Sequence, residues 1–333
     1  MTLSAYLEMR LSDDEAADNI RDRLERIGQT GFSVVYTEKG NSKTVLKAAG
    51  FWLDGEIYER AVFAEDTSNR FKREAALYEA LGLHPCILTS MGVELMPDGE
   101  EAWALRLERA PHGNLREYIE KNDTPSIVRR VQIAIDLAET MQYIHSRGII
   151  WGDVSAQNIL VFEDLRIKLC DFAGSILPGI YPDLLFSYEI RYWVPGPDNE
   201  APARGTLAME LFALGTAICE ITEWAVPYGS IEAGELRQKL LEREYPYISE
   251  NNPVRDIIQK LWHFKYSSAQ EVADALQTAC LFAEGAMGFR LGDLQQCKTE
   301  SKGWSRGQSR KDTSYDRKLE TPSIWEKLST IPS

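Results

Sequence analysis

Three polar side chains, Asp153, Asn158 and Asp171, have the types and the spacing to hold a metal ion beside a reacting hydroxyl. Asp153 and Asn158 are five residues apart, directly before an apolar run that starts at Ile159, and Asp171 follows thirteen residues after Asn158. An aspartate can orient a hydroxyl, while an asparagine and a second aspartate can hold magnesium on the phosphates of a nucleotide. The competing interpretation is that these side chains cap turns, as Asp and Asn often do.

The composition excludes several classes of function. The chain has 333 residues, of which 44% are hydrophobic and 26% are charged, so it can bury cores in roughly two domains or lobes. Its net charge of −14 makes nucleic acid an unsuitable partner. The five cysteines are scattered and form no Cys-x-x-Cys pair, which argues against a disulfide framework or a zinc site and suits a reducing compartment.

Neither a membrane segment nor a secretory signal is predicted. The longest nearly apolar stretch, near 211–221, is far shorter than the ~20 residues that cross a bilayer. The first ten residues lack both a basic start and a long apolar core. We therefore expect no membrane association and an intracellular, cytoplasmic location, with a nuclear location left open.

Apolar patterning divides the chain into a strand-rich part and a helix-rich part. In the first part we expect three strands within 24–47, an irregular acidic segment over 50–68, a helix over 69–83, and strands near 87–95 and 102–108. In the second part we expect helices over 115–121, 125–146, 206–223, 232–243, 253–262 and 268–282, with two short hairpin-like strands at 158–162 and 166–170. This order predicts an α+β fold of two lobes, a small β-rich N-lobe over 24–108 and a larger, mainly helical C-lobe over 109–284.

The two ends of the chain differ in character from its body. Residues 1–23 form an acidic leader that is helical or loose. Residues 285–333 are polar, have no period and offer little to bury, so we expect a mostly disordered tail. Within this tail, 324–328 is either part of a solvated segment or a short docking or autoregulatory element.

Several motifs occur around the three polar residues in a fixed order. Lys47 ends the third expected strand, Glu74 lies in the first expected helix, and a His-Pro pair at 84–85 follows that helix. Farther on, residues 143–150 lead directly into the polar residues. In this order the motifs resemble a divergent, eukaryotic-type domain of the protein kinase superfamily, over residues 24–282. The sequence from Asp171 through Ser175, together with Tyr-Ser-Ser-Ala-Gln-Glu-Val at 266–272, also looks similar to kinase-like proteins of filamentous fungi.

The resemblance implies a site that binds ATP. Gly28 and Gly31 belong to a degraded copy of the glycine-rich loop that covers the phosphates. Lys47 matches the lysine that grips the α- and β-phosphates, and Glu74 matches the helix glutamate that pairs with it. Glu79 is the alternative partner for this lysine.

Leu107, Glu108 and Ala110 stand where the family has its gatekeeper and hinge. In this resemblance Leu107 would back the adenine pocket. Backbone groups of Glu108 and Ala110 would bond the base, so we expect the two side chains to carry little information. The resemblance adds three further nucleotide-binding residues, Val35, Val45 and Leu160.

The resemblance also assigns roles to the three polar residues. Asp153 would orient the substrate hydroxyl and accept its proton late in the transfer. Asn158 and Asp171 would ligate Mg²⁺, or Mn²⁺, through oxygen. The expected cofactors are therefore ATP and magnesium, and the expected partners are ATP and protein substrates, with the oligomeric state left open.

Two departures from the family pattern concern charge. Gly152 stands where the family has an arginine that pairs with a phosphate on the activation segment. We therefore expect phosphorylation between Gly174 and Arg191 not to switch this protein. Ser155 replaces a lysine that neutralises the γ-phosphate, which predicts chemistry slower by ~10–10³-fold.

Other departures concern packing. Trp151 replaces a buried histidine and can supply the same bulk, and Ala173 replaces a glycine of the metal loop. Gly196 replaces a glutamate whose arginine partner is also absent near 266–268. Losing both members of a buried ion pair is easier than losing one, because a lone buried charge costs about 3–5 kcal/mol. This pattern indicates a folded, divergent lineage.

The sequence favours an active but atypical and slow protein kinase that transfers phosphoryl groups to Ser or Thr hydroxyls in preference to Tyr. All five groups expected to bind and transfer the phosphoryl group are present, namely Lys47, Glu74, Asp153, Asn158 and Asp171. The first alternative is a nucleotide-binding pseudokinase that acts as a scaffold or allosteric module. The second is a small-molecule phosphotransferase.

Overall fold

The computed structural model describes residues 22–29, 33–48, 52–53, 56–57, 60–96, 101–183, 189–194 and 205–286. The chain divides into one compact unit that ends at Glu284 and a second that begins at Gly285. Outside the described residues lie the expected leader up to residue 21, the tail from residue 287 with its segment 324–328, and Gly31.

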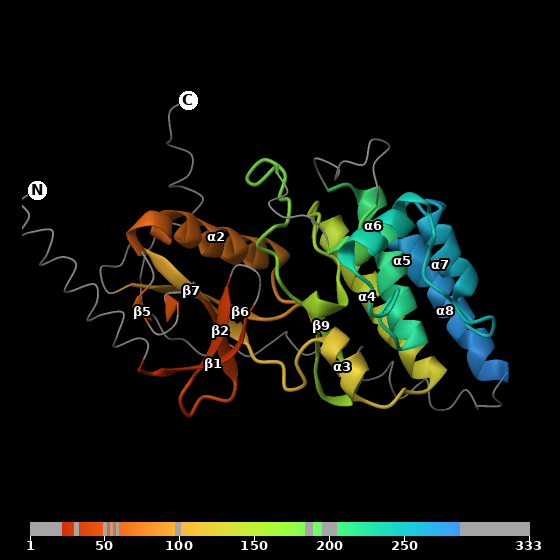
Figure 1. The fold of residues 1–333 in the computed structure, drawn as a ribbon, viewed down its shortest axis with the longest axis horizontal. Coiled ribbons are helices and arrows are strands. Elements are labelled where there is room, and N and C mark those ends of the chain that lie inside the picture. The colour runs from red at the N-terminus through yellow and green to blue at the C-terminus, as the bar shows by residue number, and fades with distance from the viewer. Residues whose placement is uncertain are drawn as a thin grey trace, which may run out of the picture. The chain divides into compact units, whose positions relative to one another are not determined.

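An antiparallel sheet and one long helix form the N-terminal part (Figure 1). The strands are β1 Leu24–Gln29, β2 Val34–Glu38, β3 Thr44–Ala48, β6 Ser90–Leu95 and β7 Ala102–Glu108, in the spatial order β1-β2-β3-β7-β6. Helix α2, Arg60–Leu81, packs on β7 and β6. On β2, Val34 and Tyr36 are buried, as the period of two in a strand requires when one face is covered.

Helix α2 corrects one expectation from the sequence. The segment 50–68 was expected to be irregular, but it contains the short pair β4 Trp52–Leu53 and β5 Glu56–Ile57, and α2 already begins at Arg60. No glycine or proline interrupts the sequence between Arg60 and Leu81, and arginine, alanine and glutamate are good helix formers. Apolar spacing alone missed the first turns because residues 61–64 form one continuous apolar block and residues 65–70 are all polar, so neither stretch shows helical spacing.

The C-terminal part is mainly helical. Its elements are α3 Leu115–Lys121, α4 Ile127–Ser146, β8 Ile159–Val161, β9 Ile167–Leu169, α5 Leu207–Glu223, α6 Ala233–Leu241, α7 Arg255–Trp262 and α8 Ala269–Ala286, with single 3-10 turns at Ala156–Asn158, Glu163–Leu165 and Ile190–Tyr192. Helix α5 packs against both α4 and α7. The expected two-lobed α+β fold is confirmed. Among the described residues, no helix combines the length and apolarity that a membrane crossing requires.

Side-chain caps explain where three of these helices begin. The side chains of Asn114, Ser126 and Thr206 accept hydrogen bonds from backbone N–H groups in the first turns of α3, α4 and α5 respectively. Each cap satisfies a donor that has no partner within its helix, and replacing such a cap with alanine typically costs about 1 kcal/mol.

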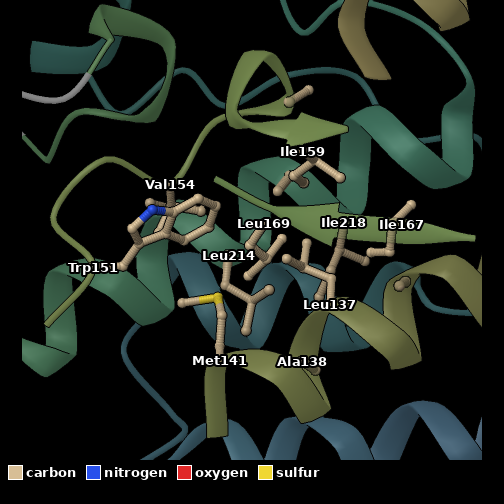
Figure 2. Packing of buried hydrophobic residues seen from close by; sticks show 14 of the residues in the cluster. Leu137, Ala138, Met141, Trp151, Val154, Ile159, Ile167, Leu169, Leu214 and Ile218 are labelled. Carbon is tan, nitrogen blue, oxygen red and sulfur yellow. The ribbon is translucent and has the colours of Figure 1, made fainter. Parts of the chain in front are cut away.

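A large hydrophobic core lies beneath the β8–β9 hairpin (Figure 2). Figure 2 shows side chains from α4 and α5 beside those of the hairpin and of the loop before it, with Leu137, Ala138, Met141, Leu214, Ile218, Ile159, Ile167, Leu169, Trp151 and Val154 labelled. Most of these side chains have no exposed area, and burying each large one contributes about 1.5–3 kcal/mol. The core therefore gives the loops at both ends of the hairpin a rigid support.

Gly215 marks a close contact between α5 and α7. A Cβ atom at this position would lie 2.8 Å from Leu261 Cβ and 3.2 Å from Trp262 Cδ1. We expect Gly215→Ala to lower the free energy of unfolding by about 1–3 kcal/mol, because a packed core must shift to accept an added methyl group. Denaturant unfolding measures this change.

The matched control is Gly234→Ala in α6. A Cβ atom there meets nothing within 4 Å, and alanine is the better helix former, so the free energy of unfolding should stay the same or rise. Equal unfolding free energies for Gly215→Ala and wild type would contradict the close packing.

Candidate active site

Lys47 is held in a buried ionic cluster by residues from two distant parts of the chain. Its Nζ atom lies 2.8 Å from Glu74 Oε2 on α2 and 2.8 Å from Asp171 Oδ1 after β9. Burial lowers the pKa of Lys47, but the carboxylates of Asp171 and Glu74 raise it more, so the pKa lies above its ordinary value. Lys47 is therefore a fixed cation. Glu79, the alternative partner, is exposed.

The strand register brings several expected nucleotide-binding residues to one face of the sheet. Val35 pairs with Lys47, and Val45 pairs with Leu107. Residues directly opposite each other on neighbouring strands share a face, as do residues two apart on one strand. Gly28 pairs with Val35 and so extends this face onto β1. Lys47 therefore lies on the same face of the sheet as Val35, Val45 and Leu107.

Asp153 and Asn158 contact each other directly. The Asn158 amide donates to Asp153 Oδ2 at 2.8 Å and to the Asp153 carbonyl at 3.0 Å. Burial, followed by the charge of Asp171, raises the pKa of Asp153 to about 7. Asp171 has a φ of +58°, a left-handed conformation that side chains other than glycine adopt at a cost. The three polar residues of the sequence prediction therefore interact with one another in the structure.

The Asn158 and Asp171 side chains suit a magnesium ion. Magnesium prefers carboxylate and amide oxygens, and it commonly takes only one or two protein ligands together with substrate phosphates. Because the Asn158 nitrogen donates to Asp153, its amide oxygen is turned to the opposite side and can act as a ligand. The donor set therefore fits a nucleotide-bound magnesium ion.

The hinge contains an ion pair that sequence reasoning missed. Leu107 is buried, and Ala110 and Leu160 pack against the main core, but the Glu108 side chain does more than expected. Lys168 Nζ on β9 donates to Glu108 Oε2 at 2.6 Å. This contact joins β7 to β9 and gives the Glu108 side chain a structural role that the resemblance did not indicate. The signal available in the sequence was the alternation of apolar and polar residues along β9, where Lys168 lies between two buried residues.

Trp151 connects residues 151–155 before the Ala156–Asn158 turn to residues 170–174 after β9. After the family resemblance these two segments are called the catalytic loop and the metal loop. Its indole N–H donates to the carbonyls of Cys170 at 3.1 Å and Asp171 at 3.2 Å, and its side chain is fully buried. The Trp151 and Phe172 ring centroids are 6.0 Å apart, and Phe172 meets Tyr78 of α2 edge-on at 5.1 Å. The expected packing role of Trp151 is confirmed. The three rings form a column from α2 to the catalytic loop.

Helix α5 anchors the catalytic loop through a buried carboxylate. The Gly152 N–H donates to Glu210 Oε1 at 2.7 Å, and Glu210 Oε2 bonds His145 Nε2 at 2.7 Å. Gly152 has a φ of +82°, which favours glycine at this position. Glu210 itself has no exposed area, so its two partners satisfy it inside the core.

A second buried carboxylate supports the segment before Trp193. Arg116 of α3 bonds both oxygens of Glu220 on α5, and it also reaches Glu189 at 3.1 Å. The Tyr192 hydroxyl donates to Glu220 and accepts from the Ala156 N–H at 3.0 Å. Sequence reasoning missed this network, although a glutamate within the apolar run of α5 requires a buried partner.

Comparison with known proteins agrees with this geometry. A family model described as protein tyrosine and serine/threonine kinase matches residues 57–276, and the chain belongs to this family. The serine/threonine/tyrosine-protein kinase HT1 of Arabidopsis thaliana is 28% identical over 162 residues, which cover 48% of this chain and 40% of HT1. The tyrosine-protein kinase transmembrane receptor Ror of Drosophila melanogaster is 26% identical over 275 residues, which cover 77% of this chain and 38% of Ror.

A third relative is a probable receptor-like protein kinase of Arabidopsis thaliana. It is 30% identical over 227 residues, which cover 63% of this chain and 61% of the relative. The chain thus spans less than two thirds of the length of each of these three relatives. Their names include both serine/threonine and tyrosine kinases, so the similarity does not decide between the two kinds of acceptor.

The Arg116–Glu220 pair should be important for stability. Arg116→Met leaves the Glu220 carboxylate buried without its cation, so we expect the free energy of unfolding to fall by about 3–5 kcal/mol. Adding Glu220→Gln should recover much of this loss, because no uncompensated charge remains. Denaturant unfolding of both variants measures the difference.

The exposed pair Lys121–Glu117, also on α3, provides the control. Its two side chains are 67% and 55% exposed, so Lys121→Met should change the free energy of unfolding by less than about 1 kcal/mol. Similar losses for Arg116→Met and Lys121→Met would contradict the importance of the buried pair.

The raised pKa of Asp153 predicts that the metal-free protein loses stability in a pH-dependent way. The native state holds this proton up to about pH 7, whereas the unfolded chain loses it near pH 4. Ionising this carboxylate therefore lowers the free energy of unfolding as the pH rises from about 4 to about 7. Above that range the full decrease is present. We expect Asp153→Asn to be more stable than wild type at pH 8 by about 1–3 kcal/mol.

Denaturant unfolding with a chelator at several pH values measures this difference. The gain of Asp153→Asn should shrink as the pH falls towards 4, and the exposed Asp123→Asn should show no such gain. A gain in stability of the same size at every pH would contradict the raised pKa of Asp153.

Proposed function

We propose that this protein kinase domain binds ATP with Mg²⁺ and transfers the γ-phosphoryl group to a hydroxyl of a protein substrate. The observation that carries the proposal is the single cluster in which Lys47 bonds Glu74 and Asp171 at the same time. A lysine fixed by two carboxylates from separate elements serves no evident packing purpose. It is the arrangement that holds nucleotide phosphates beside a metal ligand.

In this proposal the N-lobe residues position the nucleotide. The apolar face formed by Val35, Val45 and Leu107, together with Leu160 of β8, would bind the adenine. Gly28 and Gly31 would lie over the phosphates and Lys47 would bind them, while Glu74 keeps the ammonium in place. Backbone groups at Glu108 and Ala110 would bond the base.

The C-lobe residues would act on the reacting groups. Asn158 and Asp171 would hold Mg²⁺, which neutralises phosphate charge when bound. Asp153 would orient the acceptor hydroxyl and take its proton. A general base works best when its pKa lies near the working pH, and the pKa of about 7 for Asp153 in the metal-free site meets this requirement.

The chemistry should be slow because one cation of the family pattern is missing. Ser155 takes the position of the expected lysine, and its hydroxyl donates to Glu189 Oε2 at 2.8 Å. Its side chain is buried and cannot neutralise the transferring phosphate. We infer a rate lower by ~10–10³-fold than with a lysine, by analogy with loss of other transition-state donors. Ser and Thr acceptors remain the preferred prediction over Tyr.

A nucleotide-binding pseudokinase is the second candidate. The observation that favours it is again Ser155, because a protein that only binds nucleotide does not need a cation at the transferring phosphate. Such a protein would act as a scaffold or an allosteric module. The small-molecule phosphotransferase is not carried further, since the chain belongs to the protein kinase family.

Phosphate transfer from γ-labelled ATP to a mixed protein pool, with Mg²⁺ or Mn²⁺, tests the proposal. We expect wild type to label protein and Asp171→Asn to lose the label, because the variant lacks a metal-binding carboxylate. Asp153→Ala should lose transfer but bind ATP within about threefold of wild type. The exposed Asp123→Asn is the matched control and should transfer like wild type.

No label above the Asp171→Asn background, in folded wild type that binds ATP, would favour the pseudokinase. Label that enters only small molecules would overturn both candidates. Phosphosite mapping of the labelled protein then decides between Ser or Thr and Tyr acceptors.

A further inference from the structure

Arg73 on α2 is a buried cation directed at the segment that follows the metal loop. It directly precedes Glu74 and is 7% exposed. Its Nη2 atom donates to the carbonyl oxygens of Ser175 at 2.6 Å and Asp183 at 2.7 Å. Its guanidinium carbon lies 4.8 Å from the centre of the Tyr181 ring. One side chain thus contacts both ends of the segment 175–183.

The same segment is also tied to the catalytic loop. The Ser175 hydroxyl donates to the Trp151 carbonyl, and Ser175 has no exposed area. Ile176 and Ile150 exchange two backbone hydrogen bonds, at 2.9 and 3.1 Å. Tyr181 in turn pairs with Leu177 through two more, at 2.7 and 2.8 Å, so the segment folds back on itself below Arg73.

The burial of Arg73 has a cost that its contacts must offset. Desolvation lowers the pKa of Arg73, although Tyr181 and Asp183 act in the opposite direction. The Nε atom is buried and has no hydrogen-bond partner among the described residues. Hydrogen bonds from a charged donor are stronger than neutral ones, and a guanidinium can also stack on a ring, which a lysine does less well. Arginine suits this position for these reasons.

The acceptors that Arg73 uses are neutral carbonyl groups. The family pattern has an arginine at the position of Gly152 that pairs with a phosphate on the activation segment, and glycine cannot make that pair. The carbonyls of Ser175 and Asp183 are present whatever the state of modification of the chain. Arg73 therefore makes a contact that requires no phosphate.

We propose that Arg73 is a positioning residue that holds segment 175–183 against α2, and so keeps Glu74 on Lys47, without a phosphate on the segment. The proposal rests on the proposed kinase function. The link to Glu74 is direct, because the two residues are neighbours on one helix. The same helix contacts Phe172 through Tyr78, and the Phe172 carbonyl accepts from the Ser175 N–H at 3.0 Å.

The test compares Arg73→Met and Arg73→Lys with Lys72→Met, an exposed cation on the same helix. For Arg73→Met we expect kcat to fall by about 10- to 100-fold while the KM for ATP changes by less than about threefold. Hydrogen exchange at the Ile176 and Tyr181 amides should become faster by a similar factor. Arg73→Lys should recover part of both losses, and Lys72→Met should match wild type.

Hydrogen exchange and kcat are independent measurements, so failure of this proposal can be distinguished from failure of the proposed function. Unchanged exchange in Arg73→Met would overturn the proposal whether or not the protein transfers phosphate. Faster exchange with unchanged kcat would overturn the positioning role. If wild type transfers no phosphate, the proposed function fails. Hydrogen exchange alone then tests the contact between Arg73 and the segment.

Two further measurements test whether a phosphate on the segment contributes to kcat. Tyr181→Phe keeps the aromatic ring but removes its hydroxyl, and it should retain wild-type kcat within about twofold. A phosphate mapped between Gly174 and Arg191, whose enzymatic removal lowers kcat by tenfold or more, would overturn the proposal.

Discussion

The contact of one ammonium group with two carboxylates determines what the rest of the structure must do. Lys47, Glu74 and Asp171 come from a strand, a helix and a loop, and each depends on the other two, because a buried charge without a partner is costly. The sheet register sets the face of Lys47, α2 sets the position of Glu74, and the β8–β9 hairpin sets Asp171. A change that moves any of these elements therefore reaches the site through the cluster.

Buried carboxylates in the C-lobe hold the site residues on the other side in place. Glu210 holds the catalytic loop through the Gly152 N–H. Glu220 is linked to the end of that loop through the Tyr192 hydroxyl, which accepts from the Ala156 N–H. Both lie on α5, which packs between α4 and α7 in the main core. The departures from the family pattern leave this support intact. A tryptophan fills the place of the histidine, and Arg116–Glu220 is a buried ion pair between α3 and α5.

The sequence predicted most of the fold because strands and amphipathic helices repeat apolar residues with their own periods. The helix 115–121 has the expected bounds, and the polar residues at 153, 158 and 171 lie together as their spacing suggested. The early start of α2 was missed because its first turns carry little apolar periodicity. The Glu108–Lys168 pair and the Arg73 contacts were missed for another reason. They join residues 60 to 110 positions apart, and no local pattern records which distant partner a charged side chain finds.

The column formed by Trp151, Phe172 and Tyr78 has a consequence for inhibitors. A compound that binds by pushing Phe172 out of its place would have to separate it from two aromatic neighbours and disturb the loop whose carbonyls accept from the indole of Trp151. Compounds that occupy only the face of Val35 and Leu107 leave that column in place. Ligands that bind without separating these rings should therefore come from the second class.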